Sequence, residues 1–295
     1  MYLIVGAKGF LGSYLIKNIL EKTDDKIIAT DIHIDKQEDT KRVRWIEADI
    51  TNNDDIKKLN EITRKDDNLK IIYLAAYHHP DLVLKNPKIA WAVNVIALAN
   101  FLNIMDNVKA LYYPSTEVVY GTNTDNKKFT ENDRLCPSNK YGEHKVIAET
   151  MVKSYGYNVV RFPVLMGKSL AKGKKHFFDE IIETLQSGNT IEMFTDNLRS
   201  IIDFNTASKL LIDLIENPLA RQYKVVNIAS DNGISKYDFA LLIAQKYNLD
   251  KSKIIPISMD DKNQKIFTAK RAKETLLDNS LLKQILNIST ISFEI

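Results

Sequence analysis

The sequence has little or none of several features that would tie it to a particular environment. Cys136 is the single cysteine among 295 residues, which excludes an internal disulfide and fits a reducing compartment. No uninterrupted apolar run reaches the roughly 18 residues that cross a bilayer, and the chain opens on a predicted strand instead of a leader segment. We therefore expect a cytoplasmic protein that does not act at a membrane.

An excess of charge of one sign is also missing. The formal net charge is +3, and lysine and arginine are scattered among acidic residues, so we expect no nucleic-acid partner. The densest basic run, 172–175, is expected to be a solvated loop. We expect no metal site either, because His78 and His79 lack a cysteine or carboxylate at ligand spacing.

Proline is scarce, with seven residues, and no proline- or serine-rich linker, internal repeat or low-complexity tract divides the chain. The length suits one large domain and a smaller lobe. We expect the boundary near residue 162, with 163–295 forming a mainly helical lobe. Because no linker separates them, this lobe is expected to pack on the first domain and to interleave partly with it.

What the sequence does contain is a strand–turn–helix signature at its start. The apolar run Tyr2–Val5 has the length and branching of a buried parallel strand. Gly6, Gly9 and Gly12 follow at three-residue intervals, and apolar residues then recur at helical spacing. Such a turn exposes backbone N–H groups at a helix N-terminus, where a dinucleotide pyrophosphate binds. The sequence thus predicts a dinucleotide cofactor.

The second predicted strand, Lys26–Asp31, bears on the choice of cofactor. It ends in an acid about 20 residues past the glycines, the place of a carboxylate that binds ribose hydroxyls. Such a carboxylate repels a 2′-phosphate, so NAD is favoured over NADP. NADP stays possible because basic residues lie downstream: His33, Lys36, Lys41 and Arg42.

Strand and helix patterns then alternate as far as residue 162. Helices of ten or more residues between strands imply a Rossmann-type, doubly wound parallel sheet. The further strands are Val43–Glu47, Lys70–Ala75, Ala110–Ser115 and Asn158–Phe162, and the helices are Asn53–Arg64, Pro87–Met105 and Ser138–Tyr155. Beyond these we expect helices at about 177–187, 205–217, 235–247 and 279–286, and one short strand, Lys224–Ile228.

Ligands of such a sheet lie beyond the carboxyl ends of its strands. The residues that follow strands, together with two in the glycine turn, are therefore predicted cofactor contacts: Phe10, Leu11, Asp49, Ile50, Leu74, Ala75, Ala76 and Pro163. The alanines are small enough to let a cofactor lie against the backbone.

A tyrosine and a lysine four residues apart are the sharpest candidates for chemistry. Tyr141 and Lys145 share one face of a predicted helix. The ammonium favours the phenolate and brings the tyrosine, whose free pKa is about 10, toward use as a general acid/base. Thr116, after the fifth strand, is placed to orient the same substrate oxygen. His144 lies on a different helix face and is expected to be solvated.

Together these motifs resemble the extended short-chain dehydrogenase/reductases that act on nucleotide sugars. The resemblance covers nearly the whole chain and is carried by GAKGFLGS, Asp31, Asp49-Ile50, LAA, STEVVYG and YGEHK. It implies that Tyr141 is the catalytic acid/base, that Lys145 also holds the nicotinamide ribose, and that Thr116 is the third member of the site. It also implies a cofactor contact for Asn94.

The same resemblance implies a nucleotide-sugar substrate. Arg199 matches a position that meets the nucleotide phosphates, and arginine suits bidentate phosphate recognition. The ending KRAKETLLDNSLLKQIL is similar to that of the dTDP-4-dehydrorhamnose reductases. The other candidate substrate contacts are Thr116, Glu117, His176 and Arg271. The family further suggests a homodimer formed through the helices at 87–105 and 138–155.

Departures from the family pattern narrow the reaction. Dehydratases and decarboxylases of this family carry a glutamate two residues past the threonine, where this sequence has Val118. Glu117 stands one residue earlier, and a role for it in proton transfer stays open. Hydride transfer at a sugar carbon, most readily C4, remains, by a 4-epimerase or a 4-keto reductase of activated-sugar metabolism.

A rival interpretation is a non-catalytic regulatory subunit with the same fold. Thr116, Tyr141 and Lys145 are all intact, which counts against it, because a regulatory copy has no need of all three.

Overall fold

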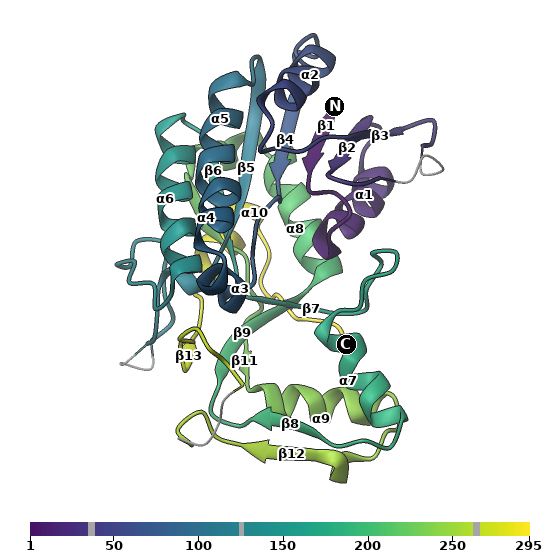
Figure 1. Cartoon of the computed structure of the whole chain (residues 1–295), viewed down its shortest axis with the longest axis vertical. Coiled ribbons are helices and arrows are strands. Elements are labelled where there is room, and N and C mark those ends of the chain that lie inside the picture. Colours follow the sequence, from purple (N-terminus) through teal and green to yellow (C-terminus); the bar gives the residue numbers. More distant parts are fainter. Residues whose placement is uncertain (35–38, 124–126, 262–265) are drawn as a thin grey trace.

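A parallel sheet of seven strands forms the centre of the computed structural model, which describes residues 1–34, 39–123, 127–261 and 266–295 (Figure 1). Its order is β10-β6-β5-β4-β1-β2-β3. The strands are β1 Tyr2–Val5, β2 Ile27–Asp31, β3 Val43–Glu47, β4 Leu69–Tyr73, β5 Val108–Thr116, β6 Asn158–Phe162 and β10 Val225–Asn227. The order reverses between β1 and β4, which opens a crevice beyond their carboxyl ends. The predicted doubly wound sheet is confirmed.

The sheet is covered on both faces because successive strand residues point to opposite sides. In β1, Tyr2 and Ile4 belong to one buried core, while Leu3 and Val5 belong to the other. The first core is closed by α1 Phe10–Lys22, α8 Phe204–Glu216 and α10 Ser280–Leu286. The second is closed by α2 Asn53–Thr63, α5 Ala97–Ile104 and α6 Lys140–Ser154.

The chain returns to the large sheet after it has left it. The strand expected at Lys224–Ile228 is β10, which pairs in parallel with β6 as the seventh strand. Helix α8 likewise packs against this sheet, through residues such as Leu211 and Leu214. Short helix α3 Pro80–Lys85 was not predicted.

The long helix predicted at Pro87–Met105 is interrupted. It consists of α4 Pro87–Trp91, a π-helical turn η2 Ala92–Ile96, and α5. Within the described part of the chain it is the one helix long and apolar enough to cross a membrane, with a mean hydropathy of 1.3. That is weak support for a membrane span, since α5 buries Leu98 and Phe101 in the protein core.

A smaller region lies below the large sheet in the view of Figure 1. Strands β7 Val164–Met166, β9 Leu198–Asp203, β11 Gly233–Ile234 and β13 Glu274–Thr275 form one small sheet, and β8 Ile191–Phe194 pairs with β12 Ile254–Ile257. Helices α7 Phe177–Gln186 and α9 Lys236–Lys246 pack on them around a separate buried cluster. These short strands were not predicted.

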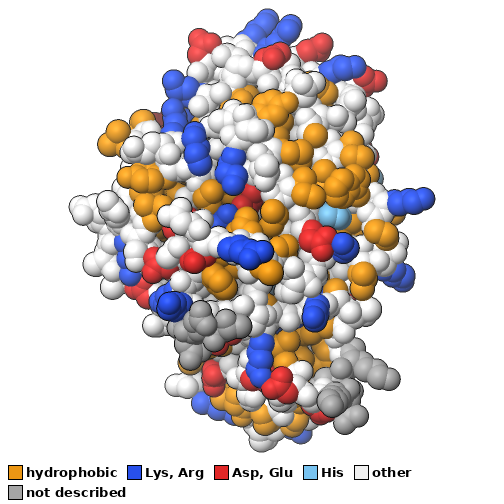
Figure 2. All heavy atoms as spheres, turned by 90° about the vertical axis from the view of Figure 1, so that its left-hand side faces the viewer, with side chains coloured by type: hydrophobic (Ala, Val, Ile, Leu, Met, Phe, Trp, Pro, Cys, Tyr) orange, Lys and Arg blue, Asp and Glu red, His pale blue; other side chains and the backbone are white. Residues whose placement is uncertain are grey.

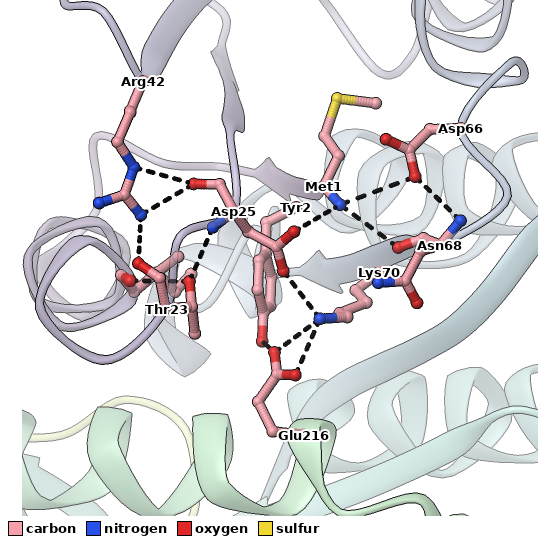
Figure 3. A network of polar contacts seen from close by, with 10 residues as sticks. Met1, Tyr2, Thr23, Asp25, Arg42, Asp66, Asn68, Lys70 and Glu216 are labelled. Atoms are coloured by element: carbon pink, nitrogen blue, oxygen red, sulfur yellow. Dashed lines mark hydrogen bonds and ion pairs between the residues drawn. The ribbon is translucent and has the colours of Figure 1, made fainter.

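A network of charges ties α8 to the amino ends of the large sheet, away from the crevice (Figure 3). The buried Lys70 ammonium binds Asp25 at 2.8 Å and Glu216 of α8 at 2.7 Å. The amino group of Met1 binds Asp25 at 3.0 Å, and the Tyr2 hydroxyl donates to Glu216. Because Lys70 is buried, loss of both Asp25 and Glu216 would leave its charge unpaired, which is costly.

Candidate active site

The glycine turn after β1 is shaped by two positions that exclude a side chain. Gly6 has φ +84°, and a Cβ there would lie 2.9 Å from the Ala75 nitrogen. A Cβ at Gly12 would lie 2.4 Å from the Ala7 oxygen. Helix α1 follows Gly9 without a side-chain cap, so its first N–H groups face the crevice and suit an anionic ligand.

A cavity of about 300 Å³ lies between the glycine turn and the ends of β2 and β3. The Asp31 carboxylate on its wall is fixed by backbone N–H groups, with Lys8 donating to Oδ2 and Ile32 donating to Oδ1, both at 2.9 Å. Each oxygen keeps a second acceptor site for a ribose hydroxyl. The other predicted contacts here are Asp49, Ile50, Leu74, Ala75 and Ala76. Lys36 lies outside the described residues.

A second cavity, of about 350 Å³, continues from the first toward β5 and α6. The two share Gly6, Gly9, Leu74, Ala76, His78 and Lys174. The second also brings together the predicted residues Phe10, Leu11, Gly12, Thr116, Tyr141, Lys145 and Pro163. Two joined cavities across the crevice, one with a carboxylate and one with a hydroxyl–phenol–ammonium set, fit an extended dinucleotide.

Lys145 and Tyr141 come from the first two turns of α6. The Lys145 ammonium donates to the Pro114 oxygen at 2.8 Å and lies 5.9 Å from the centre of the Tyr141 ring. Burial lowers the pKa of Lys145 to about 7, against the opposing effect of the Glu149 charge. Burial also raises the pKa of Tyr141. The expected lowering of the phenol pKa is therefore outweighed by desolvation in the chain alone.

A buried ion pair between Arg161 and Glu149, which the sequence did not predict, lies one helical turn after Lys145. Arg161 of β6 donates to both oxygens of Glu149, at 3.0 and 2.7 Å, and the Ser115 hydroxyl donates to Glu149 at 2.5 Å. Since Ser115 lies between Pro114 and Thr116, Glu149 and Lys145 together fix the end of β5 that carries Thr116. The sequence does contain a signal for this contact, since Glu149 follows Lys145 by four residues and so shares its helix face.

Asn94 lies behind the cofactor cavities and lines neither. Its side chain accepts from the Tyr77 N–H at 2.7 Å and donates to the Tyr77 oxygen at 3.0 Å, which holds the segment after β4. His144 was expected to be solvated, and that is wrong: it is buried against Asn94 and Trp91. Asn94 belongs to the π-helical turn, a feature often found at functional sites.

A third cavity, of about 290 Å³, opens between β5 and the smaller region and contains Glu117, His176, Arg199 and Arg271. Glu117 is 1% exposed and binds the Arg199 guanidinium at 2.5 Å. Burial raises the pKa of Glu117 to about 7, although Arg199 lowers it. The Arg199 Nε has no hydrogen-bond partner among the described residues.

Lys236, at the start of α9, is a third cation in this cavity. Its ammonium lies 5.2 Å from the ring centres of both Phe177 and Phe267. Burial, together with repulsion from Arg199 and Arg271, lowers the pKa of Lys236 to about 8. Three cations that repel one another favour an anionic ligand. A single lysine in a helical stretch gave no signal of this in the sequence.

His176 caps α7 and lies between the second and third cavities. Its Nδ1 accepts from the Phe178 N–H at 3.3 Å, so the neutral ring carries its proton on Nε2. The ring contacts Phe10 and Phe204 edge-on, each at 5.0 Å. Burial lowers the pKa of His176 to about 4, against the Asp179 charge. The histidine is therefore neutral at pH 7.

Within the described ranges no group of three or more histidine, cysteine, aspartate and glutamate side chains is placed to hold a metal ion. The candidate site is a crevice for an extended dinucleotide beside a cationic cavity, since Thr116 lines the second cavity and Glu117 the third.

Comparison with known proteins gives a family and a fold. A model of the RmlD substrate binding domain family matches residues 1–294. The chain is similar to the probable low-salt glycan biosynthesis reductase Agl14 of Haloferax volcanii, with 25% identity over 299 residues, 99% of this chain and 94% of the relative. It is also similar to subunit beta of methionine adenosyltransferase 2 of Rattus norvegicus, with 28% identity over 227 residues, 73% of this chain and 64% of the relative.

Two solved structures share the fold. One is MoeE5 in complex with UDP-glucuronic acid and NAD, with a TM-score of 0.79 and 19% identity over 99% of this chain and 94% of that one. The other is dTDP-4-dehydrorhamnose reductase from Bacillus anthracis in complex with NADP, with a TM-score of 0.78 and 22% identity over 96% of this chain and 92% of that one. At sequence identities this low, the two structures show that this chain shares their fold.

Proposed function

The chain belongs to the RmlD substrate binding domain family, and from this membership we propose that it is an NAD(P)-dependent enzyme of activated-sugar metabolism. It transfers hydride at a carbon of a nucleotide-linked sugar, most readily C4. The observation that carries the proposal is the placement of Thr116, Tyr141 and Lys145 in one cavity with the glycine turn, directly beside the cationic cavity.

The roles of the residues follow from their chemistry. A bound nicotinamide supplies or accepts the hydride. Tyr141 exchanges a proton with the sugar oxygen, and the Thr116 hydroxyl orients that oxygen. Lys145 places its ammonium beside the phenol and lowers the cost of the phenolate. The negative charge of Glu149 favours the charged form of Lys145.

The cationic cavity is proposed to hold the diphosphate of the substrate. Arg199, Lys236 and Arg271 converge there from three segments of 163–295, and guanidinium groups suit phosphate oxygens. We accordingly propose that 163–295 supplies the nucleotide-sugar lobe and 1–162 the cofactor domain, with α8 and β10 returning to the latter. NAD is the favoured cofactor because Asp31 disfavours a 2′-phosphate, and NADP is the alternative.

Two reactions fit these residues, a 4-epimerisation and the reduction of a 4-keto sugar. Val118 occupies the position of the glutamate expected in a dehydratase, so loss of water is disfavoured. The Haloferax relative described as a reductase favours the second reaction. The test is absorbance in the NADH band with a panel of UDP-, dTDP-, GDP- and CDP-sugars.

Each outcome of this test points to one function. A signal from co-purified cofactor without added NADH indicates an epimerase that recycles its own hydride. Oxidation of added NADH or NADPH by a 4-keto sugar nucleotide indicates a reductase. Nucleotide binding without either signal favours the second candidate, a regulatory subunit, which the likeness to subunit beta of methionine adenosyltransferase 2 supports.

We also propose that the enzyme is a cytoplasmic homodimer that pairs through α4, η2, α5 and α6. Apolar side chains are exposed on these helices, with Ile89 55%, Ile96 48% and Trp91 41% exposed. Figure 2 shows this side of the molecule, with hydrophobic side chains gathered in its upper part. Sedimentation analysis should give a dimer for the wild type and for Leu219→Asp, an exposed site that follows α8, and a monomer for Ile96→Asp. A monomeric wild type would refute it.

A further inference from the structure

The segment 167–176, between β7 and α7, lies across the start of α1 (Figure 1). The Tyr14 hydroxyl of α1 donates to the Lys168 oxygen at 2.9 Å. The Lys174 ammonium donates to the Lys8 oxygen, within the glycine turn, at 3.2 Å. At the end of the segment the His176 ring packs on Phe10. The smaller region therefore touches the cofactor cradle at several points along this segment.

Lys174 occupies a particular place in the crevice. It lines both cofactor cavities, together with Gly6, Gly9 and His78. A dinucleotide with its adenosine in the first cavity and its nicotinamide in the second must place its pyrophosphate where the two cavities meet. An exposed ammonium at that junction meets two negative charges that the N–H groups of α1 neutralise only in part.

The neighbouring lysines of the basic run point to other places. Lys175 pairs with Glu183 at 2.6 Å, on α7. Lys172 lines a separate surface cavity with Trp45 and Ile16. The prediction that 172–175 is merely a solvated loop is thus incomplete, because the structure turns Lys174 toward the crevice.

We propose that Lys174 binds the pyrophosphate of the cofactor and that the segment 167–176 closes over the bound dinucleotide. The inference rests on the proposed function for the presence of a dinucleotide, and adds a binding residue from the smaller region. Its consequence is that cofactor affinity depends on a residue outside the Rossmann strands and helices. Cofactor binding in turn orders the segment that leads into α7 and the substrate cavity.

The test is calorimetric titration of the wild type, Lys174→Gln and Lys175→Gln with NADH, NADPH, ADP-ribose and adenosine. The two variants change the net charge equally, so Lys175→Gln controls for long-range electrostatics. We expect Lys174→Gln to weaken NADH, NADPH and ADP-ribose by about tenfold, the effect of one charge-assisted hydrogen bond. Adenosine, which has no phosphate, and all ligands of Lys175→Gln should change in affinity by less than about twofold.

A second readout is hydrogen exchange of the amides in 168–175. NADH should slow this exchange in the wild type and in Lys175→Gln, and much less in Lys174→Gln.

The outcomes separate the inference from the proposed function. If the wild type binds neither NADH nor NADPH, both are overturned. If it binds them and Lys174→Gln binds all four ligands as Lys175→Gln does, the inference alone is overturned. A loss of affinity in Lys174→Gln that is confined to NADPH would also overturn the inference, because Lys174 would then contact the 2′-phosphate instead of the pyrophosphate.

Discussion

The two halves of the proposed active site are built by different means. The cofactor half is made largely of backbone: a glycine turn, an open helix N-terminus and the ends of parallel strands. The substrate half is made of side chains from distant segments, with Glu117 after β5, Arg199 in β9, Lys236 in α9 and Arg271 before β13. The first is therefore sensitive to added volume, and the second to changes of charge.

This difference decides what each half can tolerate. A Cβ in the glycine turn collides with backbone that cannot move aside. The cationic cavity has about 290 Å³ of open space for such volume. Loss of a charge there instead separates Glu117 from Arg199, or Arg271 from Asp81, which it binds at 3.0 Å. The predictions that follow test this contrast, beginning with the residue at which both halves meet.

Tyr141→Phe is expected to have the largest effect, because it removes the one proton that is exchanged with the sugar oxygen. Turnover should fall by about 10²- to 10⁴-fold, while calorimetry shows unchanged NADH affinity. Tyr155→Phe, at the C-terminal end of the same helix, is the matched control. Equal turnover in Tyr141→Phe and Tyr155→Phe would remove Tyr141 from the chemistry.

Gly12→Ala should damage the cofactor half alone. The new Cβ would lie 2.4 Å from the Ala7 oxygen, so α1 must shift away from the turn. We expect NADH affinity to fall by about 100-fold while binding of UDP or dTDP is retained. Gly156→Ala, at a glycine with φ +80° and nothing within 4 Å of the new Cβ, controls for a general loss of stability. NADH binding by Gly12→Ala at wild-type strength would contradict a backbone-built cradle.

Lys236→Met is the converse experiment in the substrate half. It keeps most of the length of the unbranched side chain beside Phe177 and Phe267 and removes the charge. Affinity for UDP or dTDP should fall by about tenfold with NADH affinity unchanged. Lys246→Met, in the last turn of the same helix, is the control. If Lys236→Met weakens NADH instead, the assignment of the two cavities is reversed.

The smallest expected effect is a pH dependence of stability at Glu117. Its pKa is raised from 4.5 to about 7 by burial, so the folded chain holds a proton that the unfolded chain has released. The stabilising contribution is full below about pH 4.5 and is lost as the pH rises through about 7. The unfolding free energy of the wild type relative to Glu117→Gln should fall over this window and be flat above it. A rising difference would mean that Arg199 dominates.

The same contrast explains what could be predicted from the sequence. The rule that ligands lie after parallel strands located Asp31, Asp49 and Leu74, because strand, turn and helix are contiguous in the chain. All the predicted cofactor contacts except Asn94 line the two cavities. Asn94 was named by resemblance, and its side chain instead holds the backbone of Tyr77.

The missed residues share a physical reason. Lys174, Lys236 and Arg161 lie where tertiary packing places them, and no local spacing in the sequence encodes that position. His144 was predicted to be solvated from its helix face alone, but α4 and η2 cover that face. Likewise β10 was predicted as a strand from its own residues, while its place beside β6 depends on the fold of the whole chain.

The central claim is that the joined cavities bring a nicotinamide to a nucleotide-linked sugar for a hydride transfer that depends on Tyr141. The most direct measurement is single-turnover absorbance in the NADH band, on the wild type and Tyr141→Phe, with the sugar-nucleotide panel. We predict a change with at least one sugar nucleotide in the wild type, and its loss in Tyr141→Phe with cofactor still bound. A cofactor-loaded wild type that responds to none of them, or a Tyr141→Phe variant that responds equally, would contradict it.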